Sequence, residues 1–241
     1  IGDRRQRQMC IRDSSSHTCE GVDMDDVRKM LRNLSDAAEE RGAPLDWFED
    51  LYEVADKDRN LIPWSKGEPH PFLVDWLDNH LEQSTGNALV VGCGLGEDAV
   101  FLAERGWNVT AFDLSASAID WVKEMHSHPS ISWEVGDLLD PHPAWIGTFD
   151  LVLEVHILQA IPESFRIPAS MNLAPLVRQE GVLICIGRMN PTTPIEVDGP
   201  PWPLDRSFIE SIGGELEPID FYSVQYEEEE HLRYRAVWKR S

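Results

Sequence analysis

Three glycines at alternate positions, Gly92, Gly94 and Gly96, are the residues of this 241-residue chain whose type and spacing point most directly to chemistry. An apolar run over 88–91 precedes them and predicts a buried strand, and the apolar spacing over 97–105 predicts a helix. Glycines in such a turn leave bare backbone for a ligand, because a Cβ would collide with it. The helix directs its free N–H groups toward the same turn. Strand, glycine loop and helix in this order indicate a site for a nucleotide-like cofactor.

The spacing of the glycines discriminates between cofactors. Dinucleotide-binding domains carry Gly-x-Gly-x-x-Gly, and the third position of that fingerprint is Glu97 here, whose charge would repel a pyrophosphate. This disfavours a nicotinamide-dependent dehydrogenase. Asp113 stands 21 residues after Gly92, at the end of a second predicted strand over 107–112. An acidic residue at that place can accept both hydroxyls of a ribose.

Two further strands place polar residues beside this loop. Residues 131–135 predict a third strand, which leads into Asp137 and Leu138, and residues 149–154 predict a fourth. Gly-x-Gly-x-Gly followed by acidic residues at these intervals resembles the motifs of class I S-adenosylmethionine-dependent methyltransferases, whose cofactor has no phosphate. The resemblance implies S-adenosyl-L-methionine as cofactor and S-adenosyl-L-homocysteine as product. It assigns cofactor contacts to Trp64, Gly92, Cys93, Gly94, Gly96, Asp113, Leu114, Asp137, Leu138, Glu154 and Val155.

Composition and charge limit the function classes. The formal charge of −22 and the pI near 4.6 argue against a nucleic-acid partner, because phosphate backbones need a basic surface. No apolar run approaches the ~20 residues of a membrane span, and the four cysteines show no metal-ligand spacing. We therefore expect a cytoplasmic enzyme with reduced thiols and no metal, acting on a small molecule without a membrane partner, as a monomer or weak homodimer. Its length suits one layered α/β core.

The first 15 residues differ in character from the rest. They are rich in arginine in an otherwise acidic chain, and the string over 7–14 resembles a translated sequencing adapter. We expect a non-native segment there, with a natural disordered tail as the alternative. The chain then divides into this tail (1–15), an N-terminal helical cap with a site loop (16–82) and an S-adenosylmethionine-binding methyltransferase domain (83–241).

The predicted cap consists of helices joined by an irregular segment. Helical spacing over 24–41 places Val27, Met30, Leu31 and Leu34 on one face, and shorter helices are predicted over 44–52 and 72–81. The proline-rich segment between the last two contains Trp64. An aromatic ring beside a sulfonium is favourable, because a ring face attracts a weakly hydrated cation. The alternative is that Trp64 only packs the cap against the domain, which is our interpretation for the aromatic pair at 47–48.

A closer resemblance rests on segments at both ends of the chain. Trp64-x-x-Gly67-x-x-x-Pro71 and the run over 198–202, which ends in Trp202, are similar to the thiopurine, thiol and halide methyltransferase group. The likeness runs from about residue 45 to residue 238. It implies a single Rossmann-like domain with a seven-stranded, mostly parallel sheet, an antiparallel C-terminal strand and helices on both faces. It also implies a small soft nucleophile as methyl acceptor. One departure is Glu154-Val155-His156, where the halide and thiol enzymes tend to place aromatic residues.

The remaining predicted elements complete this fold. A helix over 164–178 precedes an apolar fifth strand over 181–186, and a proline-rich loop over 189–203 follows. A short helix is predicted over 207–212. Two antiparallel strands over 216–226 and 231–239 close the sheet, with four glutamates at their turn.

The reaction needs little from the protein. Displacement of a methyl group from a sulfonium is in-line, so alignment alone can supply ~7–11 kcal/mol. A thiolate needs no base, whereas a neutral thiol or phenol does, and His156 is the candidate base because its ordinary pKa is ~6.5. Its alternative role is a hydrogen bond to backbone below the cleft. We expect Trp64, His156 and Trp202 to wall the acceptor. The alternative functions are transfer to another small oxygen or nitrogen nucleophile, or binding of the cofactor without turnover.

Overall fold

The protein is described here from a computed structural model, which covers residues 24–80, 85–193, 197 and 199–241. The predicted tail over 1–15, the two cysteines nearest the N-terminus and Asp198 therefore lie outside the described residues. Among the described residues, no helix combines the length and the apolar character that a bilayer crossing requires.

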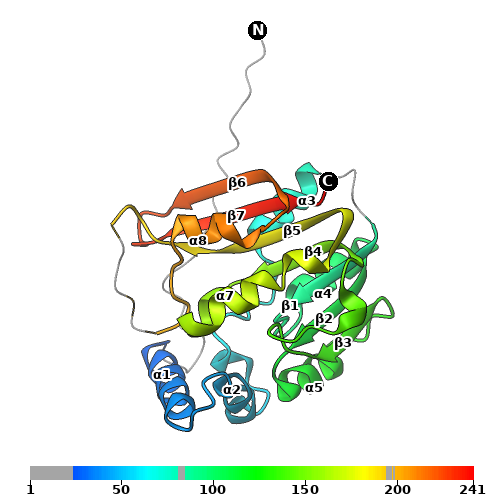
Figure 1. The fold of residues 1–241 in the computed structure, drawn as a ribbon. Coiled ribbons are helices and arrows are strands. Elements are labelled where there is room, and N and C mark those ends of the chain that lie inside the picture. Colours follow the sequence, from blue (N-terminus) through cyan, green and yellow to red (C-terminus); the bar gives the residue numbers. More distant parts are fainter. Residues whose placement is uncertain (1–23, 81–84, 194–196, 198) are drawn as a thin grey trace.

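A seven-stranded sheet forms the centre of the molecule (Figure 1). Its spatial order is β3-β2-β1-β4-β5-β7-β6. The first five strands in this order are parallel to one another, and β7 is antiparallel to both β5 and β6. The strands span Asn87–Val91 (β1), Asn108–Asp113 (β2), Ile131–Val135 (β3), Phe149–Val155 (β4), Val177–Met189 (β5), Glu217–Gln225 (β6) and Leu232–Lys239 (β7). The predicted Rossmann-like, mostly parallel sheet is confirmed.

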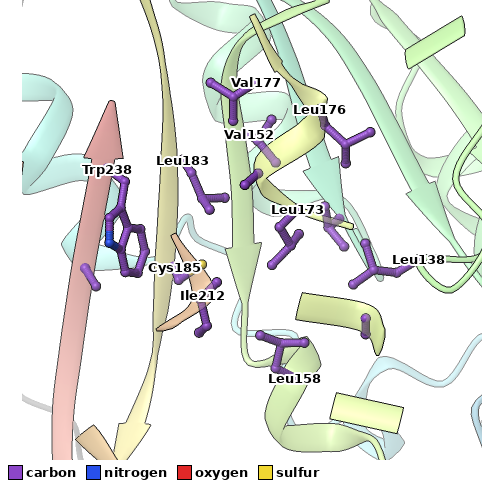
Figure 2. Close-up of a cluster of buried hydrophobic side chains, with 14 of the residues drawn as sticks. Leu138, Val152, Leu158, Leu173, Leu176, Val177, Leu183, Cys185, Ile212 and Trp238 are labelled. Carbon is purple, nitrogen blue, oxygen red and sulfur yellow. The ribbon is translucent and has the colours of Figure 1, made fainter. Parts of the chain in front are cut away.

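Helices cover both faces of the sheet, as the apolar runs of the central strands require. They span Met24–Glu40 (α1), Trp47–Ala55 (α2), Pro71–Asn79 (α3), Glu97–Glu104 (α4), Ala116–Met125 (α5), Ile157–Ala160 (α6), Glu163–Met171 (α7) and Arg206–Ile212 (α8). Helices α3, α4 and α5 pack on one face and α6, α7 and α8 on the other. Figure 2 shows the second face, where Val152 and Leu183 of the sheet gather with Leu158, Leu176 and Ile212.

The predicted helix over 164–178 is too long. Helix α7 ends at Met171, a single 3₁₀ turn follows over Ala174–Leu176, and β5 begins at Val177. Pro175 stands in that turn and has no N–H with which to continue an α-helix. Helix α5 was not among the predicted elements. Its start is fixed by Ser115, whose hydroxyl accepts a hydrogen bond from the Ala118 N–H.

Helices α1 and α2 lie together at one end of the molecule, beside α5 (Figure 1). The predicted apolar face of α1 is confirmed, because Val27 and Leu31 are buried against α2. The same cluster includes Trp47 and Leu51 of α2 and reaches Leu95 of the glycine loop. The N-terminal helices therefore pack directly on the loop that the sequence singled out.

Candidate active site

The residues that follow the parallel strands meet at one edge of the sheet, because parallel strands end on the same side. An apolar pocket opens there, and we call it the strand-end pocket. Its walls come from the ends of β1 and β2, the loop after β3, the segments around α6 and α7, and the start of α2. It is lined by Leu45, Phe48, Val91, Gly92, Phe112, Asp113, Leu114, Gly136, Asp137, Leu138, Leu139, Ile157, Ile161 and Ala169. Five of the predicted cofactor residues are thus brought together: Gly92, Asp113, Leu114, Asp137 and Leu138.

The three glycines of the loop serve different purposes. A Cβ on Gly92 would collide with the Ile157 side chain, and one on Gly96 would lie 2.5 Å from the Trp133 ring. Both residues also have positive φ, so they allow the turn to pack tightly against the protein itself. A Cβ on Gly94 would face the N-terminal helices, 3.1 Å from the Tyr52 hydroxyl and 3.5 Å from Trp64 Nε1. Packing within the protein is therefore by itself a sufficient reason for glycine at positions 92 and 96.

Glu97 anchors the segment that carries Trp64. Its carboxylate accepts hydrogen bonds from Arg59 (2.5 Å), from the Ser65 hydroxyl and from the Gly67 N–H (3.3 Å). Sequence reasoning used Glu97 only to exclude a pyrophosphate and missed this role. Carboxylates are favourable in the first turn of a helix, where the dipole is positive, and that position was the available signal.

Trp64 lies over the glycine loop as a result of this anchoring. Its indole N–H donates to the Tyr52 hydroxyl at 3.1 Å, and its side chain packs edge-on against the rings of Tyr52 and Trp47. The residue is 41% exposed, and it is not among the residues that line the strand-end pocket. Both predicted roles of Trp64, packing and site wall, are compatible with this position.

Asp113 is held by backbone N–H groups at the end of β2. Its Oδ2 accepts from the Gly94 N–H at 2.9 Å and its Oδ1 from the Ser115 N–H at 3.0 Å. Burial raises the pKa of this carboxyl, and the backbone hydrogen bonds oppose the rise. Each oxygen can still accept a further hydrogen bond, because a carboxylate oxygen has two lone pairs. The predicted contact with ribose hydroxyls is therefore chemically available.

Cys93 and Asp137 are oriented by the protein. Burial raises the pKa of the Cys93 thiol well above its usual range, and its Sγ lies 3.9 Å from the Gly94 carbonyl oxygen. The Cys93 backbone N–H donates to the Phe112 carbonyl, and the Cys93 carbonyl accepts from the Gly96 N–H, both at 2.9 Å. Asp137 accepts a hydrogen bond from the Leu139 N–H at 2.8 Å, which fixes the turn after β3 in the wall of the strand-end pocket.

Glu154, predicted to contact the cofactor, caps the start of a helix. Its Oε1 accepts from the Leu158 N–H at 3.0 Å at the start of α6, and the residue is 1% exposed. Its Oε2 is buried without a hydrogen-bond partner among the described residues. Burial raises the pKa of this carboxyl from 4.5 to about 7. Val155 packs on the opposite face of the sheet, against the core beneath α3 and α4.

His156 begins α6 with a left-handed backbone conformation (φ 63°, ψ 3°). Its Nδ1 lies 2.9 Å from Gln159 Oε1, and burial lowers the pKa of the imidazole well below its usual range. The His70 ring lies 6.0 Å from the His156 ring, centroid to centroid. Burial, with a contribution from Arg233, lowers the pKa of His70 to about 3. Both imidazoles are therefore neutral at pH 7, and His70 is a site neighbour that the sequence did not reveal.

Two arginines face each other near these histidines. Arg188 on β5 and Arg233 on β7 are cross-strand partners, an arrangement that is destabilising for like charges. Glu229 binds Arg233 through two hydrogen bonds of 2.8 and 2.5 Å. Arg188 Nε is buried without a hydrogen-bond partner in the described part of the chain, and burial lowers the pKa of Arg188 to about 10. Both arginines lie close enough to His156 to lower the pKa of its imidazole further.

Trp202 lies at a different cavity from the strand-end pocket and apart from Trp64. It borders a second cavity, of about 510 Å³, between α1 and the start of α7, where its ring also faces the Arg166 guanidinium. Its backbone N–H donates to the Gln159 carbonyl at 2.9 Å, which ties the loop after β5 to α6. The structure therefore links Trp202 to the His156 segment through Gln159. No hydrogen bond or ring contact among the described residues joins Trp64 to either of them.

Comparisons with known proteins agree with this architecture. The thiopurine S-methyltransferase family matches residues 55–232. Thiocyanate methyltransferase 1 of Arabidopsis thaliana is 32% identical over 178 residues, which are 72% of this chain and 74% of the relative. Probable thiol methyltransferase 2 of the same plant is 27% identical over 168 residues, covering 67% and 70% of the two chains.

Solved structures show the same fold at low identity. The magnesium protoporphyrin IX methyltransferase of Synechocystis, crystallised with S-adenosyl-L-homocysteine, superposes with a TM-score of 0.62 at 16% identity over 80% of this chain and 98% of that one. An N-methyltransferase of Bradyrhizobium japonicum, also with S-adenosyl-L-homocysteine, gives 0.58 at 19% identity over 80% and 97%. Together with the match over 55–232, these likenesses establish that the chain belongs to the thiopurine S-methyltransferase family and is an S-adenosylmethionine-dependent methyltransferase of small molecules.

Proposed function

We propose that this enzyme transfers a methyl group to a small, soft nucleophile that is negatively charged when it reacts, such as thiocyanate or an ionised thiol. The observation that carries this proposal is the Arg188 guanidinium, whose Nε has no partner among the described residues, close to neutral His156. The half-buried Arg188 side chain is repelled by Arg233 and attracted by Glu229, and an anion beside its unpartnered Nε would give that nitrogen a hydrogen-bond acceptor. The names of the thiocyanate and thiol methyltransferase relatives point to the same acceptors.

The cofactor S-adenosyl-L-methionine supplies an already activated methyl carbon. Its residues in this chain are, in our proposal, Asp113 for the ribose hydroxyls, the turn at Asp137 and Leu138 for the adenine, and the Gly94 backbone beneath Trp64. The apolar strand-end pocket and the lone pairs of Asp113 fit such a ligand. The protein's contribution to the rate is then mainly alignment of the two reactants and exclusion of water.

A second acceptor class is favoured by His156. A neutral imidazole can accept a proton, which a phenol or another hydroxyl must lose before or during methyl transfer. A methyltransferase of Mycobacteroides abscessus that acts on 2-heptyl-1-hydroxyquinolin-4(1H)-one is 23% identical over 160 residues, covering 64% of this chain and 69% of that one. A hydroxyl acceptor is therefore the alternative substrate, with His156 as its base.

Release of S-adenosyl-L-homocysteine tests the proposal. We would measure it with thiocyanate, thiophenol and phenol between pH 6 and 9. We expect turnover of thiocyanate, and an at least tenfold higher KM for thiocyanate in Arg188→Gln with an unchanged Kd for the cofactor. Arg206→Gln, at an exposed arginine paired with Glu210, is the matched control. Turnover of phenol alone would replace the proposal by the hydroxyl alternative. Cofactor binding without turnover of any acceptor would refute both.

A further inference from the structure

We propose that Gln159 is a positioning residue that holds His156 in the tautomer with its proton on Nδ1, so that the lone pair of Nε2 is available to an acceptor. This inference rests on the proposed function for its catalytic consequence. The tautomer itself follows from hydrogen bonds around one buried amide and can be measured without any turnover.

The orientation of the Gln159 amide is determined by three backbone groups. Its Nε2 donates to the carbonyl oxygens of Arg188 (2.5 Å) and Trp202 (3.0 Å), and its Oε1 accepts from the Arg188 N–H (2.7 Å). Carbonyl oxygens can only accept hydrogen bonds, and an N–H can only donate. An inverted amide would place donor against donor and acceptor against acceptor. The amide of Gln159 is therefore fixed without reference to the histidine.

The fixed amide in turn fixes the imidazole. The atom that faces His156 Nδ1, at 2.9 Å, is Gln159 Oε1, which is an acceptor. Nδ1 of the neutral ring must then carry the hydrogen, and Nε2 must carry the lone pair. Nε2 makes no hydrogen bond with the described residues and is not among their buried unpartnered atoms, so it keeps some exposure to solvent.

The surroundings of Gln159 are built to keep it in place. The residue is 1% exposed, although glutamine side chains are mostly found on the surface. Residue 187 on β5 is a glycine, and this leaves room for the Gln159 amide, because a Cβ there would collide with Gln159 Oε1. The His156 backbone N–H donates to the Ile186 carbonyl at 3.0 Å, so the ring is held from its backbone as well as from Nδ1.

The neighbouring histidine has the opposite tautomer, which gives the site an internal comparison. His70 Nδ1 accepts a hydrogen bond from the Phe72 N–H at 3.2 Å. A neutral His70 must therefore carry its hydrogen on Nε2. The two rings, 6.0 Å apart, differ in which nitrogen is protonated, because Nδ1 of His70 accepts a hydrogen bond whereas Nδ1 of His156 donates one.

Nitrogen NMR of the full chain tests the inference directly. Long-range ¹H–¹⁵N correlation at pH 7.5 distinguishes protonated from unprotonated ring nitrogens, and His156→Asn assigns the signal of His156 by its loss. We expect a protonated Nδ1 for His156 and a protonated Nε2 for His70. A protonated Nε2 on His156 in the wild-type protein would overturn the inference, whatever the activity proves to be.

The variant Gln159→Glu tests the consequence for catalysis. A carboxylate beside Nδ1 stabilises the imidazolium, so the acidic limb of the kcat/KM profile for phenol should move upward by at least one pH unit. Gln179→Glu, an exposed position on β5, adds the same charge as a control and should leave the profile unchanged. An unchanged profile in folded Gln159→Glu would overturn the positioning role. If Gln159→Glu does not fold, the wild-type NMR result decides. An Nδ1–H tautomer with no acceptor methylated would refute the proposed function alone.

Discussion

Replacing Glu154 by glutamine should make the enzyme more stable above about pH 4.5, with the full effect reached above pH 7. The buried carboxyl has a pKa of about 7 in the folded protein and 4.5 ordinarily. Below pH 4.5 the carboxyl is protonated in both the folded and the unfolded protein, so it has no pH-dependent effect on the free energy of unfolding. Between pH 4.5 and 7 the unfolded chain releases the proton while the folded protein retains it, so stability falls as pH rises. The wild-type protein thus loses stability that a neutral side chain would keep.

The magnitude follows from the difference in pKa. Each pKa unit corresponds to about 1.4 kcal/mol, so 2.5 units give a loss of about 3 kcal/mol by pH 8. Glutamine retains an oxygen that can accept the Leu158 N–H and has no charge to lose. The free energy of unfolding of Glu154→Gln, minus that of the wild type, should therefore increase by about 3 kcal/mol between pH 4.5 and 8.

Urea unfolding, followed by tryptophan fluorescence at several pH values, measures this difference. Glu104→Gln removes one negative charge at an exposed position of α4 and is the matched control. If the curves of free energy against pH for the wild type and Glu154→Gln run parallel, the carboxyl is not the buried, proton-retaining group that the structure describes.

Three further predictions concern the cofactor site. Gly94→Val should abolish binding of S-adenosyl-L-methionine in calorimetry while the protein stays folded by circular dichroism, because the side chain would enter the space beneath Tyr52 and Trp64 at a positive φ; wild-type affinity would disprove the assignment of the loop. Asp113→Ala should weaken cofactor binding by ~1.5–3 kcal/mol, the scale of hydrogen bonds to a charged group, and normal binding would mean that another residue holds the ribose. Glu97→Gln should weaken the contacts with Arg59 and Ser65 and so raise the protease sensitivity of residues 59–70. Cofactor affinity should fall in parallel. An unchanged digestion pattern would show that Glu97 does not hold this segment in place.

Local patterns in the sequence determined the fold class and the cofactor. The glycine loop, Asp113 and the turn at Asp137 follow successive strands, and each is recognisable from the few residues around it. Because parallel strands end at the same edge, short patterns along the chain predict which residues meet there. The limits of α7 and β5 were not predictable to the same degree, since the apolar spacing over 172–177 suits a helix as well as the observed turn and strand.

The tertiary structure alone decided what the polar residues do. Glu97 contacts residues 30 and more positions earlier in the chain, and Gln159 contacts Arg188 and Trp202, 29 and 43 positions later. His70 and Arg188 acquire their shifted pKa values from burial, which no spacing in the sequence reveals. The spacing of the apolar residues indicates whether a segment forms a helix or a strand and which of its residues are buried. The hydrogen-bond partner of a buried polar group is decided by which distant backbone reaches it, and so emerged only when the chain was folded.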